Sequence, residues 1–172
     1  MTRLFYRLRR DAKGAATVEF AVISVFFFFV IMGGMDIAMY YIQQSKLGSA
    51  VSAGSASAFQ NRATVDYTAL QTYIRQASRA PAGTTVGVTT SCNGGTTTCA
   101  NTGRTCACLS QSGSYVSAAS CTAACTGTGM TSNSTAGYYL TITASYAYRP
   151  VLLPHGFMTG KSVQRTSTIR LQ

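Results

Sequence analysis

The organisation of this chain follows from residues 13–20, Lys13-Gly14-Ala15-Ala16-Thr17-Val18-Glu19-Phe20, because a long apolar run begins directly behind them. Residues 20–35 contain no charged side chain. A secretory signal is normally cut behind its apolar region, at a site of small residues. In this chain the small residues Gly14 and Ala15 lie in front of that region. We therefore predict a leader, residues 1–14, whose removal leaves the apolar helix on the mature protein.

The apolar run is long enough to cross a membrane. A bilayer core takes about 20 mostly apolar residues, and segment 20–42 carries a single charged residue, Asp36. At about 1.5 Å per residue, Asp36 lies roughly 25 Å along the helix axis from Glu19, so the two acids can lie near opposite interfaces. Tyr40 and Tyr41 stand where interfacial aromatic residues are common. We predict one transmembrane segment, 20–42, with Asp36, Tyr40 and Tyr41 at the far interface.

The distribution of charge predicts the orientation of this segment. The 172-residue chain has a formal net charge of +10, and the leader supplies +4 of it. A basic cluster on the N-terminal flank of an apolar helix stays in the cytoplasm, so the C-terminal part is predicted to be exported. Nucleic-acid binding is the competing explanation of the excess charge. The basic residues behind the leader are scattered without a dense run, and no nucleic-acid partner is expected.

The helix is predicted to continue beyond the membrane, from about residue 15 to about residue 59. No proline interrupts residues 15–80. Its small residues permit close approach of another helix, although Gly48 and Gly54 weaken the helix itself. The alternative is a flexible linker rich in Ser, Gly and Ala.

The remaining residues, 61–172, show one helical pattern and three strand patterns. A helix is predicted from residue 65 or 66 to residue 79, where four residues recur at i, i+3, i+4 and i+7, namely Leu70, Tyr73, Ile74 and Ala77. Segments 84–90, 138–148 and 162–172 alternate as strands do, although Arg165 and Ser167 interrupt the apolar face of the last one. The predicted fold class is α+β: a long N-terminal transmembrane helix that continues into a small exported domain, with a second helix and an antiparallel sheet of about three strands.

All six cysteines lie in one insertion, residues 91–136, which we call the cysteine-rich insertion: Cys92, Cys99, Cys106, Cys108, Cys121 and Cys125. Their spacing does not match a zinc ribbon, and no metal site is predicted. An even cysteine count in an exported domain favours disulfides, and three are predicted. Six cysteines allow 15 pairings, among which the sequence does not choose. The insertion is either an exposed surface for adhesion or partner recognition, or a tolerated surface insertion.

The residues needed for catalysis are scarce. Outside the membrane-proximal segment the only acid is Asp66, and His155 is the only histidine. Paired-carboxylate chemistry is therefore excluded within one chain, and nothing around these two residues indicates a Ser-His-Asp triad. No phosphate-binding glycine loop is present. Neither an enzyme nor a cofactor is predicted.

Two sets of motifs resemble known proteins. The Gly14-Ala15 junction, with Glu19 as the fifth residue of the product, resembles the type IV prepilin signal, and Glu19-Phe20 resembles its Flp/Tad branch. A closer resemblance, to the TadE-like proteins of Tad pilus systems, rests on Gly34-x-Asp36, on Tyr40-Tyr41-x-Gln43-Gln44 and on the ending Tyr146-x-Tyr148-Arg149-Pro150, followed by a strand with Arg170.

This resemblance implies a minor pilin or pseudopilin that helps to assemble or prime a Tad/Flp-type pilus. It implies cleavage after Gly14 by a prepilin peptidase, and pairing of Glu19 with the new α-amine of Ala15 on a neighbouring subunit. The implied partners are other pilin or pseudopilin subunits, the Tad assembly platform and membrane lipid. The implied location is the bacterial inner membrane, with a periplasmic or extracellular C-terminal domain. The alternative is a membrane-anchored binding protein, for adhesion or DNA uptake, that uses the cysteine-rich insertion.

Overall fold

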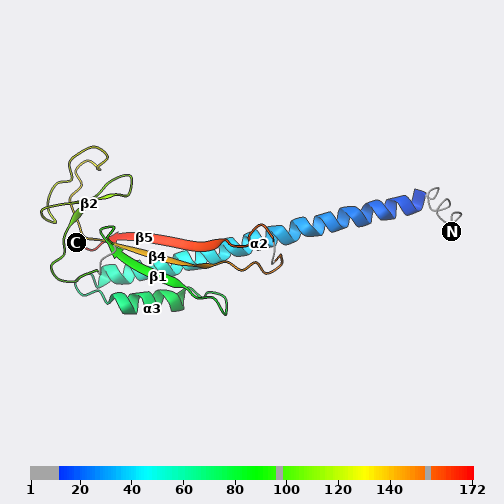
Figure 1. The fold of residues 1–172 in the computed structure, drawn as a ribbon, viewed down its shortest axis with the longest axis horizontal. Coiled ribbons are helices and arrows are strands. Elements are labelled where there is room, and N and C mark those ends of the chain that lie inside the picture. The colour runs from blue at the N-terminus through cyan, green and yellow to red at the C-terminus, as the bar shows by residue number, and fades with distance from the viewer. Residues whose placement is uncertain (1–11, 96–98, 154–155) are drawn as a thin grey trace. The chain divides into compact units, whose positions relative to one another are not determined.

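The computed structural model describes residues 12–95, 99–153 and 156–172. Its elements follow the order α2, α3, β1, β2, β3, β4 and β5 (Figure 1). The chain divides into two compact units. The first combines the chain up to Tyr40 with Arg149–Thr159, and the second combines Tyr41–Tyr148 with Gly160–Gln172. Most of the predicted leader (residues 1–11) and His155 lie outside the described residues.

α2 is one helix of 49 residues, Ala12–Gln60. At a rise of about 1.5 Å per residue it is roughly 74 Å long. The predicted long helix is confirmed and the flexible-linker alternative is wrong, because helical hydrogen bonding continues through the Ser-, Gly- and Ala-rich stretch. Within the described part of the chain, α2 is the one helix long and apolar enough to cross a membrane.

α3 spans Tyr67–Ala77 in the second unit. Asp66 caps its N-terminus, since its Oδ1 accepts the backbone N–H groups of Thr68 and Ala69 at 3.0 and 2.9 Å. Leu70 and Ile74 are buried, as the helical spacing predicts, whereas Tyr73 remains 47% exposed. The second helix is therefore confirmed, with an end slightly earlier than predicted.

The second unit also contains an antiparallel sheet in the order β1-β4-β5, formed by Gly87–Cys92, Tyr139–Ala147 and Ser162–Arg170. The three predicted strands are confirmed, although β1 begins and ends later than its pattern indicated. One face of the central strand is buried, as its alternation predicts: Leu140, Ile142, Ala144 and Tyr146. The other face carries threonines whose hydroxyls pair across strands, at 3.0 Å for Thr141 with Thr168 and 3.1 Å for Thr143 with Thr166.

Helices cover the buried face of the sheet. In Figure 1, α3 runs alongside β1, and the C-terminal half of α2 runs along the sheet. The side-chain amide of Gln71 in α3 donates to Thr90 Oγ1 of β1 at 3.1 Å. α2 and α3 meet at Gly54, where an added Cβ would lie 2.7 Å from Cδ1 of Ile74. A glycine at position 54 thus allows the two helices to approach closely.

The two residues that interrupt the apolar face of β5 also point toward α2. Arg165 and Ser167 pair in register with the buried Ala144 and Ile142 of β4. The Nε of Arg165 donates to the backbone carbonyl of Gln44 at 3.3 Å. The hydroxyl of Ser55, itself buried in α2, donates to Ser167 Oγ at 2.8 Å. These polar residues therefore bind the helix and do not break the sheet.

The cysteine-rich insertion folds around a second, two-stranded sheet that the sequence did not predict. Its strands are β2 (Ala107–Leu109) and β3 (Tyr115–Ser117), which pair antiparallel. The three predicted disulfides are present, and the structure pairs Cys92 with Cys99, Cys106 with Cys121 and Cys108 with Cys125. Strands of three residues carry too little periodicity to be recognised in a sequence.

Candidate functional site

The predicted cleavage junction lies in the first turns of α2. Gly14 is helical and exposed, and Ala15 follows it in the helix. Glu19 and Phe20 are exposed as well. Positions 15 and 19 are separated by one helical turn and so lie on the same face. The structure thus keeps Glu19 available to another molecule. Cleavage and subunit pairing remain predictions.

The apolar run presents its large side chains on all sides of the helix. Every Phe, Val and Ile from Val18 to Val30 is more than half exposed, and the largest value is 73% at Phe20. A helix that is apolar all round belongs in a bilayer or inside a larger assembly. Exposed apolar surface of this extent marks an interaction surface.

Asp36 differs from the large apolar side chains of residues 18–30, because it is only 1% exposed. Its carboxylate accepts three consecutive backbone N–H groups from the segment that follows β4. Val151 and Leu152 donate to Oδ1 at 3.1 Å each, and Leu153 donates to Oδ2 at 2.9 Å. A buried carboxylate is costly unless it is hydrogen-bonded, and bonds to a charged acceptor are among the stronger ones. Asp36 therefore fixes this segment to α2 within the first unit.

A second contact lies one turn earlier on the same helix. Gly33 is buried, and an added Cβ there would lie 3.5 Å from Cε1 of Phe157. Positions 33 and 36 share a helix face. The ring of Phe157 packs beside Gly33, while the side chain remains 60% exposed. Two described stretches, 149–153 and 156–159, thus contact α2; we call them the hairpin loop, since they connect β4 and β5.

The sequence identified Asp36 but missed its partners. A lone acid inside an apolar run needs a partner, and this was the signal that a partner segment exists. Tyr40 is half-buried and Tyr41 is 63% exposed. The placement of Asp36, Tyr40 and Tyr41 at the membrane interface remains a prediction.

The cysteine-rich insertion is attached to the main sheet by hydrogen bonds. Asn93 exchanges two of them with the backbone of Tyr139, both at 2.9 Å. The phenol of Tyr115 lies 3.1 Å from Thr141 Oγ1. Every cysteine is in a disulfide, and the described residues contain no group of His, Cys, Asp or Glu able to hold a metal ion. The insertion is therefore a disulfide-bonded segment that is hydrogen-bonded to the main sheet.

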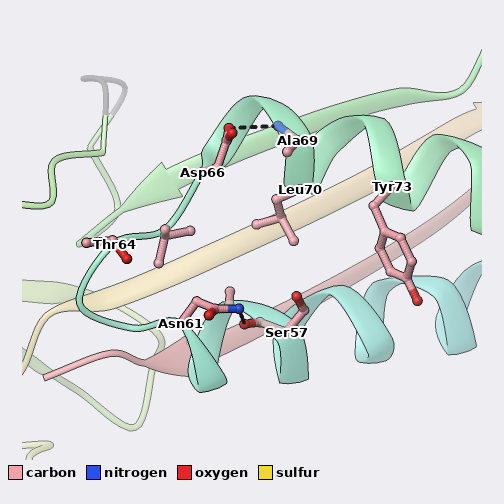
Figure 2. A pocket seen from close by; sticks show the side chains of 9 residues that line it. Ser57, Asn61, Thr64, Asp66, Ala69, Leu70 and Tyr73 are labelled. Atoms are coloured by element: carbon pink, nitrogen blue, oxygen red, sulfur yellow. Dashed lines mark hydrogen bonds between the residues drawn. The ribbon is translucent and has the colours of Figure 1, made fainter.

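A surface pocket of about 280 Å³ lies between the end of α2 and the start of α3 (Figure 2). Asp66, its one carboxylate, already caps α3, and Figure 2 shows its bond to the backbone of Ala69. The side-chain amide of Asn61 donates to the carbonyl of Ser57 at 3.1 Å. Leu70 and Tyr73 complete much of the wall. The one carboxylate that lines the pocket is therefore engaged, through Oδ1, in capping α3.

Together these features define a protein with one exposed, membrane-capable apolar helix and a small disulfide-bonded α+β unit. The family model described as TadE-like protein matches residues 14–56. The match begins at the predicted cleavage junction, includes the whole apolar run and ends near the C-terminus of α2. Residues 14–56 therefore carry a TadE-like domain, and the resemblance drawn from the motifs within them is confirmed; the motif at 146–150 lies outside the match. No curated protein and no solved structure matches the chain.

Proposed function

We propose that this chain is a minor pilin or pseudopilin that helps to assemble or prime a Tad/Flp-type pilus. In this proposal a prepilin peptidase cuts the chain between Gly14 and Ala15. The observation that carries it is the exposed apolar surface of α2 within the segment that matches TadE-like proteins. Such a surface needs an apolar environment. The bilayer supplies it before assembly, and neighbouring pilin helices supply it afterwards.

Glu19 is the residue we assign to subunit pairing. An acid inside an apolar helix bundle is costly unless it is paired. Cleavage creates an α-amine on Ala15, and this amine on a neighbouring subunit neutralises Glu19. Phe20 packs beside the pair, against helices of other subunits or of the assembly platform. The pairing sets the axial register of one subunit against the next.

The proposed location is the bacterial inner membrane, with the N-terminus in the cytoplasm and the second unit in the periplasm or outside the cell. The six paired cysteines support export of the second unit, since disulfides persist in oxidising compartments and are rare in the cytosol. The basic leader supports the same orientation.

Substitution of Glu19 tests the proposed role. Glu19→Ala and Glu19→Gln remove the negative charge and leave the apolar run intact. Both are expected to abolish piliation while the protein still inserts and is still cut after Gly14. Val18→Ile, a neighbouring change that keeps the apolar surface, is the matched control and is expected to be piliated. Normal piliation with Glu19→Ala would contradict the proposal.

The second candidate is a membrane-anchored binding protein, and the folded cysteine-rich insertion favours it. Three disulfides and a separate two-stranded sheet constrain the described part of this segment. A surface ordered in this way loses less entropy on binding a partner than a flexible one does.

The strand pairing offers a clean way to remove the insertion. Cys92 at the end of β1 lies opposite Leu140 of β4 in the antiparallel register. The insertion therefore connects two neighbouring antiparallel strands. Residues 95–137 can be replaced by Asn-Gly, the preferred two-residue hairpin turn, which keeps Gly94 opposite Tyr138 in the register of β1 and β4, together with Cys92→Ser. A pilin role that needs only α2 predicts that pili still form. A pure binding role predicts that function is lost in this variant and is normal in Glu19→Ala.

A further inference from the structure

The position along α2 at which the hairpin loop contacts the helix suggests a role for the loop that its sequence alone does not indicate. Its contacts with the helix lie at Gly33 and Asp36. If α2 crosses the bilayer as proposed, with Glu19 near the cytoplasmic face, Asp36 lies roughly 25 Å farther along the axis. The hydrocarbon core is about 30 Å thick. The loop is thus held at the edge of the hydrocarbon on the far side.

The loop carries large apolar side chains that remain exposed in the described part of the chain. Val151 is 64% exposed, Leu152 40% and Phe157 60%. Three large exposed apolar residues in so short a segment are unusual for a loop that faces water, because loops are otherwise rich in polar residues that tolerate hydration.

The backbone of the loop is prepared for a poorly hydrated environment. The N–H groups of residues 151–153 are bound to the Asp36 carboxylate. The N–H of Gly156 donates to the carbonyl of Leu153 at 2.8 Å, and that of Thr159 donates to the carbonyl of Gly156 at 3.0 Å. Backbone groups that enter lipid must be satisfied within the protein, and these five N–H groups are.

Basic residues flank the loop at both ends. Arg149 precedes its apolar residues and Lys161 follows them, and both side chains are exposed. Basic side chains next to an apolar segment suit a position beside anionic lipid headgroups. Arg and Lys at membrane boundaries also extend their charged ends toward the headgroups while their stems remain in the apolar layer.

We infer that the hairpin loop is a second membrane contact of this protein, which inserts Val151, Leu152 and Phe157 into the lipid leaflet opposite the leader. Arg149 and Lys161 contact the phosphates of that leaflet. The inference rests on the proposed insertion of α2. Its consequence is that the loop, bound to Asp36, sets how far the helix is drawn into the bilayer.

Tryptophan fluorescence tests this inference directly, because the chain contains no tryptophan. Phe157→Trp places a single reporter on the loop of the full-length protein, reconstituted in phosphatidylcholine–phosphatidylglycerol vesicles. Phosphatidylcholine brominated along its acyl chains then serves as the quencher. Two control reporters have similar exposure: Phe27→Trp in the apolar run (59% exposed at Phe27) and Phe59→Trp near the end of α2 (51% at Phe59). Leu152→Trp is the second loop reporter if Phe157→Trp does not fold.

The expected result is a blue-shifted loop emission that brominated lipid quenches to an extent approaching that of Phe27→Trp, with no quenching of Phe59→Trp. Quenching of Phe27→Trp without quenching of either loop reporter would overturn the inference and leave the membrane-spanning helix intact. A blue shift of the loop reporters that brominated lipid does not quench would also overturn it, because the loop would then be packed against protein. Absence of quenching in Phe27→Trp would instead contradict the proposed insertion of α2.

Discussion

The carboxylate of Asp36 accepts the backbone N–H of Leu153 at 2.9 Å, across 117 positions of sequence. With the bonds from Val151 and Leu152, this contact joins the start of the chain to the connection between its last two strands. A single charged residue in an apolar helix thereby becomes the attachment point of the hairpin loop.

Removal of the Asp36 carboxylate is expected to release this loop. In Asp36→Ala three N–H groups lose their acceptor, and a hydrogen bond to a charged group contributes about 1.5–3 kcal/mol to stability. Hydrogen exchange at residues 151–153 should accelerate strongly in this variant. Asp36→Asn keeps one acceptor oxygen and should fall between the wild type and Asp36→Ala. Unchanged exchange at residues 151–153 in Asp36→Ala would show that other contacts hold the loop.

The close approach of α2 and α3 at Gly54 predicts that Gly54→Ala lowers stability, although alanine has the higher helix propensity. Gly54→Ala places a Cβ against Ile74, and overpacking of a core costs about 1–3 kcal/mol, more than the roughly 1 kcal/mol that Ala gains over Gly in a helix. The melting temperature of the detergent-solubilised protein should therefore fall.

Gly48→Ala is the matched control for Gly54→Ala, because its added Cβ would lie 3.6 Å from the flexible Arg165 side chain. This variant should be neutral or slightly stabilising. Combining Gly54→Ala with Ile74→Val removes Cδ1 but keeps Cγ1, which also lies 2.7 Å from the new Cβ, so only a small part of the loss should be recovered. A melting temperature raised by Gly54→Ala alone would show that α2 and α3 are not packed as described.

The disulfide pairing predicts a simple result from non-reducing digestion. Arg104 separates Cys92 and Cys99 from the other four cysteines, and residues 80–103 and 105–148 contain no Lys or Arg. Trypsin should therefore release a peptide of residues 80–104 that is free of the remaining cysteines, as the bond between Cys92 and Cys99 requires. Recovery of this peptide only after reduction would mean that Cys92 or Cys99 pairs with a cysteine beyond Arg104.

Tyr146 predicts a loss of stability at alkaline pH. Its phenol is 5% exposed and donates to Gln43 Oε1 at 3.4 Å, and burial raises its pKa above the ordinary value. The unfolded chain therefore ionises this group first, near pH 10. The stability that the neutral phenol contributes is complete below that pH and is lost as pH rises toward the folded-state pKa.

The corresponding variant is Tyr146→Phe, which removes the ionisable group and a long hydrogen bond. Urea unfolding at pH 7.5 and pH 10.5 should show a smaller drop in unfolding free energy for Tyr146→Phe than for the wild type. Equal drops in both proteins would show that Tyr146 does not contribute to the alkaline sensitivity.

Local patterns predicted most of the elements of this fold. The uninterrupted stretch without proline predicted α2, the spacing of Leu70 and Ile74 predicted α3, and alternation along β4 predicted the buried face of the sheet. These patterns act over one or two turns or along one strand, so they are visible in the sequence.

Contacts between distant segments were not predictable in this way. Arg165 and Ser167 interrupt the apolar alternation of β5, and their polar side chains are explained only by their contacts with Gln44 and Ser55 of α2. The partners of Asp36 lie more than a hundred residues away, and no local pattern indicates backbone N–H groups as partners. The three disulfides were expected, but their pairing depends on the tertiary structure, to which the spacing of the cysteines gives no guide.

The intact mass of the protein extracted from membranes, before and after reduction with thiol alkylation, reports both cleavage after Gly14 and the number of paired cysteines. We expect a chain that begins at Ala15, with or without N-terminal methylation, and that takes up six alkyl groups only after reduction, since all six cysteines are paired. A membrane-extracted protein that still begins at Met1 would contradict the assignment as a processed pilin or pseudopilin.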